Sequence, residues 1–261
     1  MGTSELSISK SVGRVFQVLE YFREARTPRS TPDLERELNY PYSSARVILK
    51  SLHELGYLDY NGAAKKYFPT HKLSELCDWV PIARFESSGL FDFLDSVYAQ
   101  AGETTLLSAR GFIFSNNFRI KNGVQPMSVK GRGGVGLTLT NSVTGRVLLS
   151  QMTSDEIDQV VLHTDYWAKA TNQPSTAKKE DVLRSIEFIR KHGYFSNYDG
   201  FKKGVGTISC PIPAPMPNFP LAISISAPID RIRHREAGIL QMLRRQSAAY
   251  MATVPATHSP S

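Results

Sequence analysis

Residues 30–68 read STPDLERELNYPYSSARVILKSLHELGYLDYNGAAKKYF. The segment opens with Ser30 and Thr31, either of which suits a helix N-cap, and then with a proline that suits the first helical turn. A second proline, Pro41, ends this short helix because proline disfavours the helical conformation of the residue before it. A second helix is predicted to start near Ser43 and to run to residue 55. The segment therefore predicts two short helices joined by a tight turn.

A β-hairpin is predicted directly after the second helix. Gly56 supplies a left-handed stop for that helix, and residues 57–60 have the pattern of a strand. Asn61-Gly62 is a strong hairpin signal, and residues 65–68 return as the partner strand. Helix, tight turn, helix and a hairpin with a basic tip form a winged helix-turn-helix, a unit that docks on DNA.

The second helix is the candidate DNA-reading helix, because its two faces differ. The residues expected to point inward recur at helical spacing and are apolar: Ala45, Ile48, Leu49, Leu52 and Leu55. The residues expected to point outward lie near the N-terminal half, which enters the major groove in this motif: Tyr42, Ser43, Arg46, Val47 and Lys50. Arg46 can address a guanine edge or a phosphate, and Ser43 or Ser44 can donate to a phosphate. The alternative is that Ser43 or Ser44 only caps the helix and that Arg46 and Lys50 are solvated.

A further helix before this segment supplies the third wall that so small a domain needs to bury its leucines. It starts near Ser9, and one apolar face is expected to contain Val12, Val15, Phe16, Leu19 and Phe22. Four basic residues of this predicted DNA-binding domain are the candidates for salt-dependent phosphate contacts: Arg14, Arg29, Lys65 and Lys66.

Composition limits the class of protein. The chain has 261 residues, which fits two domains better than one, and a formal net charge of +7, which makes a polyanionic partner plausible. Its two cysteines, Cys77 and Cys210, are far apart and form no disulfide framework, so a reducing cytoplasm is the expected setting. The polar N-terminus argues against a signal peptide. No apolar run reaches the ~18 residues needed to span a bilayer.

The second half is predicted to be an α+β domain with a largely antiparallel sheet and helices on it. A linker with a helical face at Leu73, Leu76 and Val80 precedes a helix over 82–100, whose apolar residues suit either the second domain or a dimer seam. The expected strands cover 104–109, 112–120, 137–140, 194–198, 205–213 and 221–227. The expected helices cover 142–152, a segment capped by Thr153 or Ser154, 177–191 and 231–251, whereas 164–176 is expected to be a loop.

At this point the chain resembles the IclR family of bacterial transcriptional regulators, from Ser9 to about Met251. The N-terminal match consists of Ser11-Val12-Gly13-Arg14, Pro41-Tyr42-Ser43-Ser44, Leu49-Lys50-Ser51-Leu52 and Gly56-Tyr57-Leu58. The C-terminal match consists of residues 139–149, Gly193-Tyr194, Gly204-Val205, 208–211 and 222–226. One departure is Val47, where the family usually has arginine. Arg46 stands one place earlier, which rotates the basic group by about 100° around the helix.

The resemblance implies three regions: a winged helix-turn-helix DNA-binding domain over 8–70, a linker helix region over 71–101 and a GAF-like effector-binding domain over 102–251. It implies a regulator that binds operator DNA as a dimer or tetramer and responds to a small organic effector. The implied effector contacts are Leu137, Val143, Thr144, Asn197, Thr207, Ser224 and Ser226. Ser224 and Ser226 alternate with isoleucines, so their hydroxyls face one side of a strand, unless that side is a solvent-facing edge.

The same resemblance suggests the charge of the effector. Asn197 stands where the family commonly has aspartate, and Gly200 stands where relatives often have an acidic residue. Lys202 and Lys203 follow nearby. The loss of negative charge suits an anionic effector such as a carboxylate.

Enzyme functions are not indicated. The run at 131–136 satisfies G-x-G-x-x-G, but a strand-like segment follows it instead of the helix that a dinucleotide fold requires. Cys210 has no histidine at a spacing that implies partnership, so a buried core cysteine is the preferred interpretation. No metal-ligand spacing is present, and no cofactor is predicted. The alternative function, from another class, is a ligand sensor whose winged helix contacts proteins and not DNA.

Overall fold

The computed structural model of the chain describes residues 9–77, 79–131, 137–171, 177–199, 203–216 and 218–253. The chain divides into two compact units, Met1–Ala83 and Arg84–Ser261, and each is described by itself. Four features singled out in the sequence lie outside the described residues: most of the glycine run (132–136), the end of the predicted loop (172–176), Gly200 and Lys202.

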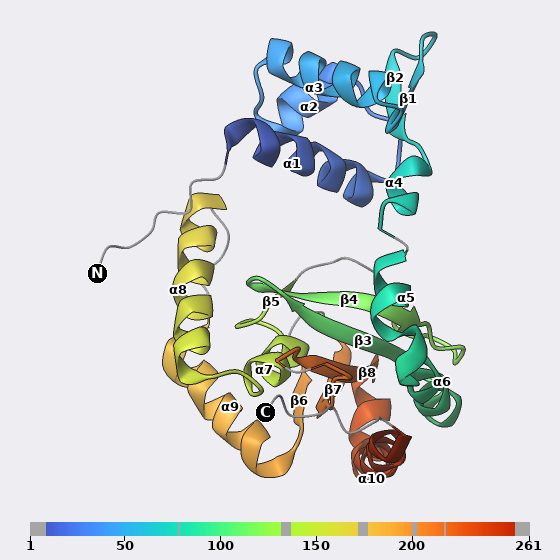
Figure 1. Cartoon of the computed structure of the whole chain (residues 1–261), viewed down its shortest axis with the longest axis vertical. Helices are drawn as coiled ribbons and strands as arrows, with labels where there is room; N and C mark the ends of the chain where they lie inside the picture. Colours follow the sequence, from blue (N-terminus) through green and yellow to red (C-terminus); the bar gives the residue numbers. More distant parts are fainter. Residues whose placement is uncertain are drawn as a thin grey trace, which may run out of the picture. The chain divides into compact units, whose positions relative to one another are not determined.

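The first unit confirms the winged helix-turn-helix (Figure 1). Its elements are α1 (Lys10–Ala25), α2 (Thr31–Leu38), α3 (Tyr42–Glu54), β1 (Leu58–Asn61) and β2 (Lys66–Pro69), followed by the short α4 (Lys72–Glu75). Residues from all three long helices and from the hairpin bury one core, which includes Phe22, Leu34, Leu49 and Leu58. The core is shared, so none of these helices would be stable alone.

The predicted inward faces of α1 and α3 are partly wrong. Val18 and Phe22 are the buried residues of α1, whereas Val12 and Phe16 are 53% and 62% exposed. Their apolar stripe is wider than the surface that two short neighbouring helices can cover. Leu55 is also exposed, because it is the C-cap of α3 and lies past the last turn that faces the core.

Local signals explain how α2 and the hairpin form. Ser30 Oγ accepts from Asp33 N at 3.4 Å, and Asp33 Oδ2 accepts from Ser30 N at 2.8 Å, so a full capping box starts α2. In the hairpin Asn61 pairs with Lys66, which makes the loop four residues long. Its left-handed residue is Lys65, with φ of 52°, and not Gly62. The hairpin is confirmed, but its turn differs from the one that Asn-Gly favours.

The expected helix over 82–100 is broken in two. α5 (Trp79–Phe85) is followed by the 3-10 turn η1 (Glu86–Ser88), and α6 (Leu90–Ala101) restarts after Gly89, whose φ is +69°. A left-handed glycine interrupts a helix at low cost. Leu90, Leu94 and Val97 of α6 are buried in the core of the second unit, so the apolar set of this helix packs on its own sheet.

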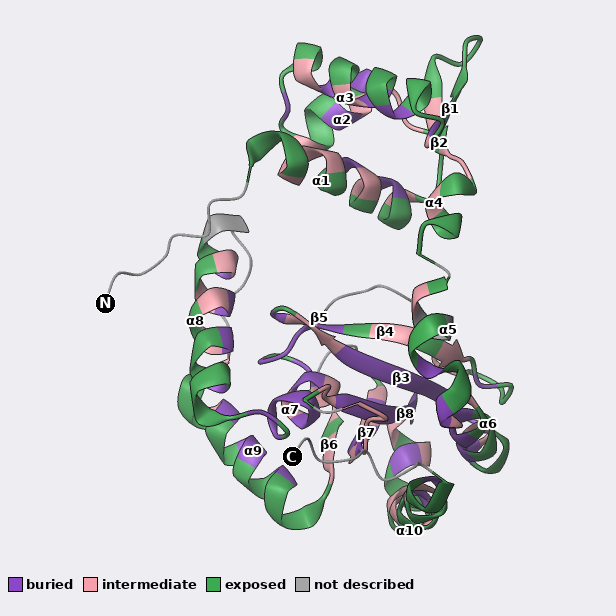
Figure 2. Cartoon of the chain, in the orientation of Figure 1, coloured by how far each residue is buried: buried purple, intermediate pink, exposed green. Residues whose placement is uncertain are grey.

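The second unit is built on a six-stranded antiparallel sheet in the order β5-β4-β3-β8-β7-β6. The strands are β3 (Thr104–Gly111), β4 (Phe114–Lys121), β5 (Leu137–Thr138), β6 (Phe195–Tyr198), β7 (Val205–Ile212) and β8 (Leu221–Pro228). Figure 2 shows the central strands β3 and β8 buried. The α+β class is thereby confirmed, although the segment after the glycine run is a strand only at 137–138.

Helices cover both faces of the sheet. One core joins β3, β7 and β8 to α6 and α10 (Ile229–Thr253), and another joins α7 (Val143–Leu149), α8 (Ser154–Thr171) and α9 (Lys179–His192). The predicted loop over 164–176 is wrong for residues 164–171, which continue α8. Thr164 is fully buried in that helix, and its hydroxyl is satisfied because it donates to Val160 O at 2.7 Å. The polar composition of the segment does not reveal this contact.

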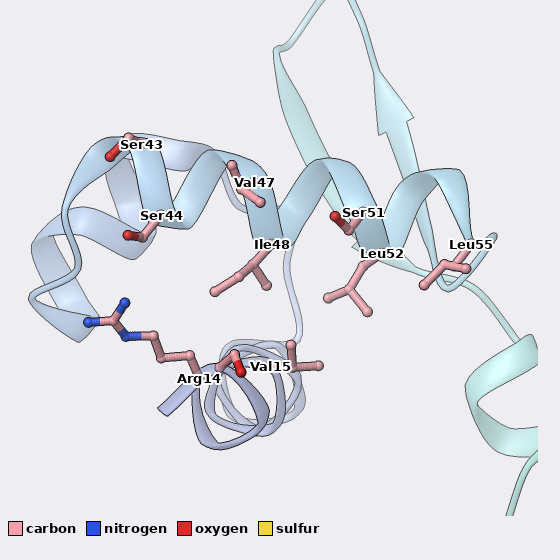
Figure 3. Close-up of a pocket in the computed structure, with 10 residues that line it drawn as sticks. Arg14, Val15, Ser43, Ser44, Val47, Ile48, Ser51, Leu52 and Leu55 are labelled. Carbon is pink, nitrogen blue, oxygen red and sulfur yellow. The ribbon is translucent and has the colours of Figure 1, made fainter. Parts of the chain in front are cut away.

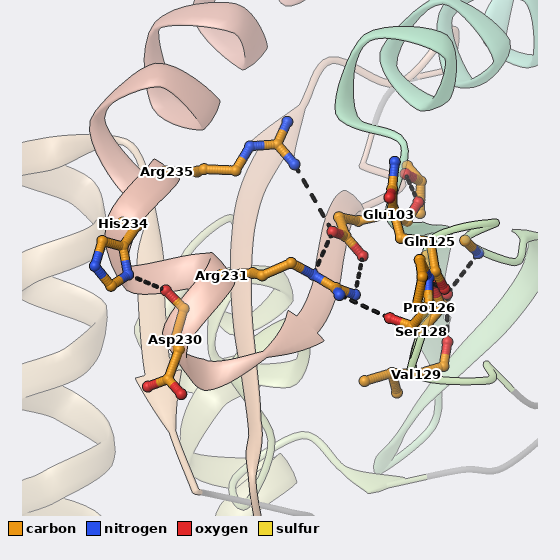
Figure 4. Close-up of polar contacts among 12 residues, drawn as sticks. Glu103, Gln125, Pro126, Ser128, Val129, Asp230, Arg231, His234 and Arg235 are labelled. Atoms are coloured by element: carbon orange, nitrogen blue, oxygen red, sulfur yellow. Dashed lines mark hydrogen bonds and ion pairs between the residues drawn. The ribbon is translucent and has the colours of Figure 1, made fainter.

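An ion pair between the buried Glu103 and Arg231, whose side chain is 32% exposed, ties the start of β3 to α10 (Figure 4). Glu103 is 1% exposed, and Arg231 places Nε 2.8 Å from Oε1 and Nη2 3.1 Å from Oε2 of its carboxylate. Arg231 also donates to Pro126 O at 2.7 Å, and Arg235 lies 3.7 Å from Glu103. The pair therefore holds the 122–131 loop as well as the helix.

Across the described part of the chain no helix has the length and apolarity needed to cross a bilayer.

Candidate functional site

The outward face of α3 is confirmed as exposed. Tyr42, Ser43, Arg46, Val47 and Lys50 are exposed, whereas Ala45, Leu49 and Leu52 are buried. At about 100° per residue, Ser43, Val47, Lys50 and Glu54 form the line opposite the buried side. Tyr42, Arg46 and His53 flank that line on one side, while Ser44, Ile48 and Leu55 flank it on the other.

The N-terminus of α3 is open, unlike that of α2. Pro41 is its N-cap, and among the described residues no side chain caps its first turn. The alternative in which Ser43 or Ser44 caps the helix is therefore wrong, because both lie inside it. The first N–H groups of a helix lack intrahelical acceptors, so this end can receive an anionic oxygen.

Arg14 brings a cation to the same end. Its guanidinium lies 5.2 Å from the centre of the Tyr40 ring. Figure 3 shows Arg14 of α1 extended toward the start of α3, where Ser43 and Ser44 lie, across a hollow of about 500 Å³. Val15, Ile48 and the leucines of α3 line the rest of this hollow, so it is polar near the start of α3 and apolar toward its other end.

The other flank of α3 meets the wing. His53 Nδ1 lies 2.8 Å from Leu58 O, and the Tyr60 and Tyr67 rings lie 4.6 Å apart. Burial raises the pKa of the Tyr67 phenol, and the charge of Arg46 opposes that rise. Lys65 and Lys66 are exposed at the hairpin loop. Lys50 is also exposed but forms an ion pair with Glu54 at 3.4 Å.

Arg29 occupies a more structural position than the other predicted DNA contacts. Its backbone forms an isolated bridge to Tyr67, with N–O distances of 2.9 and 2.7 Å, so it pairs with the edge of β2 that faces away from β1. Its guanidinium lies 5.4 Å from the Tyr21 ring centre, and the residue is half-buried. A phosphate contact by Arg29 stays a prediction.

In the second unit one face of the sheet gathers the predicted hydroxyls. Leu221, Ile223 and Ile225 face the core of α6 and α10, so Ser224 and Ser226 face the opposite side of β8. β8 is a central strand, and these serines are 1% and 9% exposed, which rules out a solvent-facing edge. Polar groups in such a place need partners.

Those partners come from other elements. Thr144 Oγ1 of α7 shares a hydrogen bond of 2.8 Å with Ser224 Oγ, and Thr207 Oγ1 of β7 shares one of 2.9 Å with Ser226 Oγ. Ser224 also donates to Ser209 Oγ at 2.9 Å. Ser209 was missed in the sequence, although its alternation with Thr207 along β7 is the signal that points to it.

The remaining predicted effector residues lie at the borders of this face. Asn197 is exposed on β6 and pairs with Thr207 in register. Leu137 is on β5 at the opposite edge, with four strands between it and β6. Val143 is the first residue of α7, whose N-cap Ser142 accepts from Gly145 N at 2.9 Å. Lys203, one of the predicted cations, is exposed.

Cys210 has the environment of a core thiol. It is buried on β7, and burial raises its pKa to about 12. At pH 8 we expect iodoacetamide to alkylate the exposed Cys77 and to spare Cys210 in the folded chain, because the thiolate is the reactive form. Peptide mass spectrometry before and after urea unfolding measures this. Equal labelling of both cysteines in the folded chain would contradict it.

Within the described ranges no three His, Cys, Asp or Glu side chains converge as metal ligands.

The comparisons with known proteins agree with both halves of the chain. The IclR helix-turn-helix domain profile matches residues 11–62, and the profile of the bacterial transcriptional regulator IclR C-terminal domain matches residues 93–251. The HTH-type transcriptional regulator XynR of Escherichia coli (strain K12) is 24% identical over 235 residues, which cover 88% of this chain and 91% of that protein.

Solved structures show the same fold. An IclR transcriptional regulator from Alicyclobacillus acidocaldarius superposes with a TM-score of 0.75 at 16% identity, covering 95% of this chain and 99% of that one. An IclR homolog from Microbacterium hydrocarbonoxydans complexed with 4-hydroxybenzoate gives a TM-score of 0.73 at 18% identity, covering 95% and 100%. Both matching profiles describe domains of transcriptional regulators, which agrees with the expectation that the chain is not an enzyme. The chain belongs to the IclR family of bacterial transcriptional regulators, with an N-terminal helix-turn-helix domain and a C-terminal effector-binding domain.

Proposed function

We propose that this chain binds operator DNA as a homodimer or tetramer in the cytoplasm and that a small organic carboxylate, held by its second unit, modulates the binding. The observation that carries the DNA part is the open N-terminus of α3, where Arg14, Ser43 and Ser44 surround N–H groups that no described side chain caps. Two such helices would engage half-sites about 34 Å apart, or a multiple of that distance.

The effector part rests on the hydroxyls of the second unit. Four hydroxyl groups form hydrogen bonds mainly with one another: those of Thr144, Thr207, Ser224 and Ser226. An oxygen atom of a ligand can take the place of one of these hydroxyl partners at little cost in free energy, because one hydrogen bond is exchanged for another. Asn197, which pairs with Thr207, adds a donor, and the exposed Lys203 in the turn before β7 adds a positive charge. The 4-hydroxybenzoate bound by a structural relative supports the carboxylate class.

Fluorescence anisotropy with the DNA upstream of the chain's own gene tests the proposal. We expect saturable binding at low salt, and we expect carboxylates that raise the melting temperature of the full chain to change the affinity. If no fragment binds at low salt, with or without such a ligand, the winged helix contacts proteins instead. If only neutral or cationic compounds raise the melting temperature, the carboxylate assignment is wrong.

The wing gives a separate prediction. Replacing Lys65 and Lys66 by alanine should weaken binding about equally on all sequences, because phosphate contacts are independent of sequence. The slope of log affinity against log salt should fall by about 0.9 for each lost phosphate contact. A control variant with Lys169 and Lys191 replaced, two exposed lysines of the second unit, should keep the slope. Equal slopes for both variants would remove the wing from the interface.

A further inference from the structure

Val47 is an exposed apolar residue at the centre of a polar helix face. Its side chain is 64% exposed. Along the outward line of α3 it stands between Ser43 on one side and Lys50 and Glu54 on the other. A single exposed valine is common on protein surfaces. What distinguishes this one is its place on the part of α3 that the proposed function puts into the major groove.

Val47 is one of the residues that line the neighbouring hollow, and it lies at the outer border of that hollow. Ile48, Leu52 and Leu55 line that hollow together with Val15. Figure 3 shows Ile48 and Leu52 directed toward α1, whereas Val47 lies higher on the helix, at the border of the hollow. A contact made by the outward side of α3 therefore covers Val47 without filling the space between α1 and α3.

The neighbours of Val47 restrict what can cover it. A surface that buries the methyl groups of Val47 must at the same time accept a hydrogen bond from the Ser43 hydroxyl and accommodate the charges of Lys50 and Glu54. A duplex meets these demands, because phosphates and base edges surround the few apolar groups of the major groove. Thymine is the base that offers an apolar group there, its C5 methyl.

We propose that Val47 determines sequence preference by burying the C5 methyl of a thymine in each operator half-site. The inference rests on the proposed DNA binding. Arg46 lies on the wing flank of α3, about 100° away, and so addresses a different position. Removal of one methyl from such a contact should cost about fourfold in affinity, the value for one buried methylene-sized group.

Deoxyuridine tests the contact, because it removes only the methyl group. Preferred sites are first selected from random duplex DNA with the full-length chain, and each thymine of the selected half-site is then replaced by deoxyuridine. For the wild-type chain we expect about fourfold weaker binding at one position in each half-site and little change elsewhere. Val47→Ala should bind thymine and deoxyuridine equally at that position. Leu55→Ala, which shortens the exposed apolar residue at the C-cap of α3, should keep the discrimination.

The outcomes separate this inference from the proposed function. Selected sites that tolerate deoxyuridine at every position would overturn the inference while leaving DNA binding intact. Discrimination that persists in Val47→Ala would also overturn it, because another residue would then contact the methyl group. Failure to select any duplex at low salt would overturn the proposed function itself.

Discussion

Replacement of Arg46 by alanine is expected to weaken binding to the preferred operator by about 1–3 kcal/mol per half-site and to relax the preference at one base pair. Arg46 is exposed on the same flank of α3 as His53, which contacts the wing, and it lies in the half of the helix that enters the groove. A guanidinium can donate two parallel hydrogen bonds to guanine O6 and N7, which no other base offers in the major groove. In a dimer the loss occurs twice, so the total effect is about 2–6 kcal/mol when the half-sites are independent.

Fluorescence anisotropy on the selected site and on its single-base variants measures this effect. Arg46→Lys is the matched variant, since it keeps the charge and loses the bidentate geometry. If Arg46 reads a base, both variants should lose the preference at the same base pair. If Arg46→Lys keeps full affinity and Arg46→Ala keeps the preference, then Arg46 contacts a phosphate.

The first unit was predictable because its signals are local. The capping box of Ser30 and Asp33, the left-handed Gly56 and the hairpin around Asn61 each act within a few residues. One error, the type of the hairpin turn, is local, because Lys65 and not Gly62 is the left-handed residue. The errors in the helix faces arose where coverage by other elements decides. Val12 and Phe16 fit the helical period but lie beyond the surface that the other helices cover, and periodicity contains no information on that limit.

For the second unit the sequence predicts which side of a strand a residue faces, but it does not predict how the strands and helices pack together. Alternation along β8 placed Ser224 and Ser226 on one side, because that alternation is a property of any strand. The partners of these serines come from α7 and from β7, and their proximity follows from the strand order. Strand order depends on long-range pairing, which a single sequence does not specify, so the hydrogen bonds of Ser224 with Ser209 and with Thr144 are visible only in the structure.

The largest expected effect on stability concerns the ion pair of Glu103 and Arg231. Replacement of Arg231 by methionine should lower the free energy of unfolding of the second unit by up to about 3–5 kcal/mol, the usual cost of leaving a buried charge without its partner, because Glu103 is buried although Arg231 is 32% exposed. Glu103 is 1% exposed, and after the substitution the one described cation left within ion-pair distance of its charge would be Arg235, which is 3.7 Å away and 43% exposed. The bond from Arg231 to Pro126 O would also be lost, so the 122–131 loop should loosen.

A double-mutant cycle distinguishes the buried charge from simple loss of packing. Glu103→Gln combined with Arg231→Met should be more stable than Arg231→Met alone, because the amide carries no uncompensated charge. Urea unfolding, with hydrogen exchange in β3 and β8 as the local readout, measures both variants. Arg184→Ala is the control, since its pair with Asp181 is exposed and such pairs contribute about 0–1 kcal/mol. If Arg231→Met were no more destabilised than this control, solvent would have to reach the Glu103 carboxylate, and the pair would not hold α10 to the sheet.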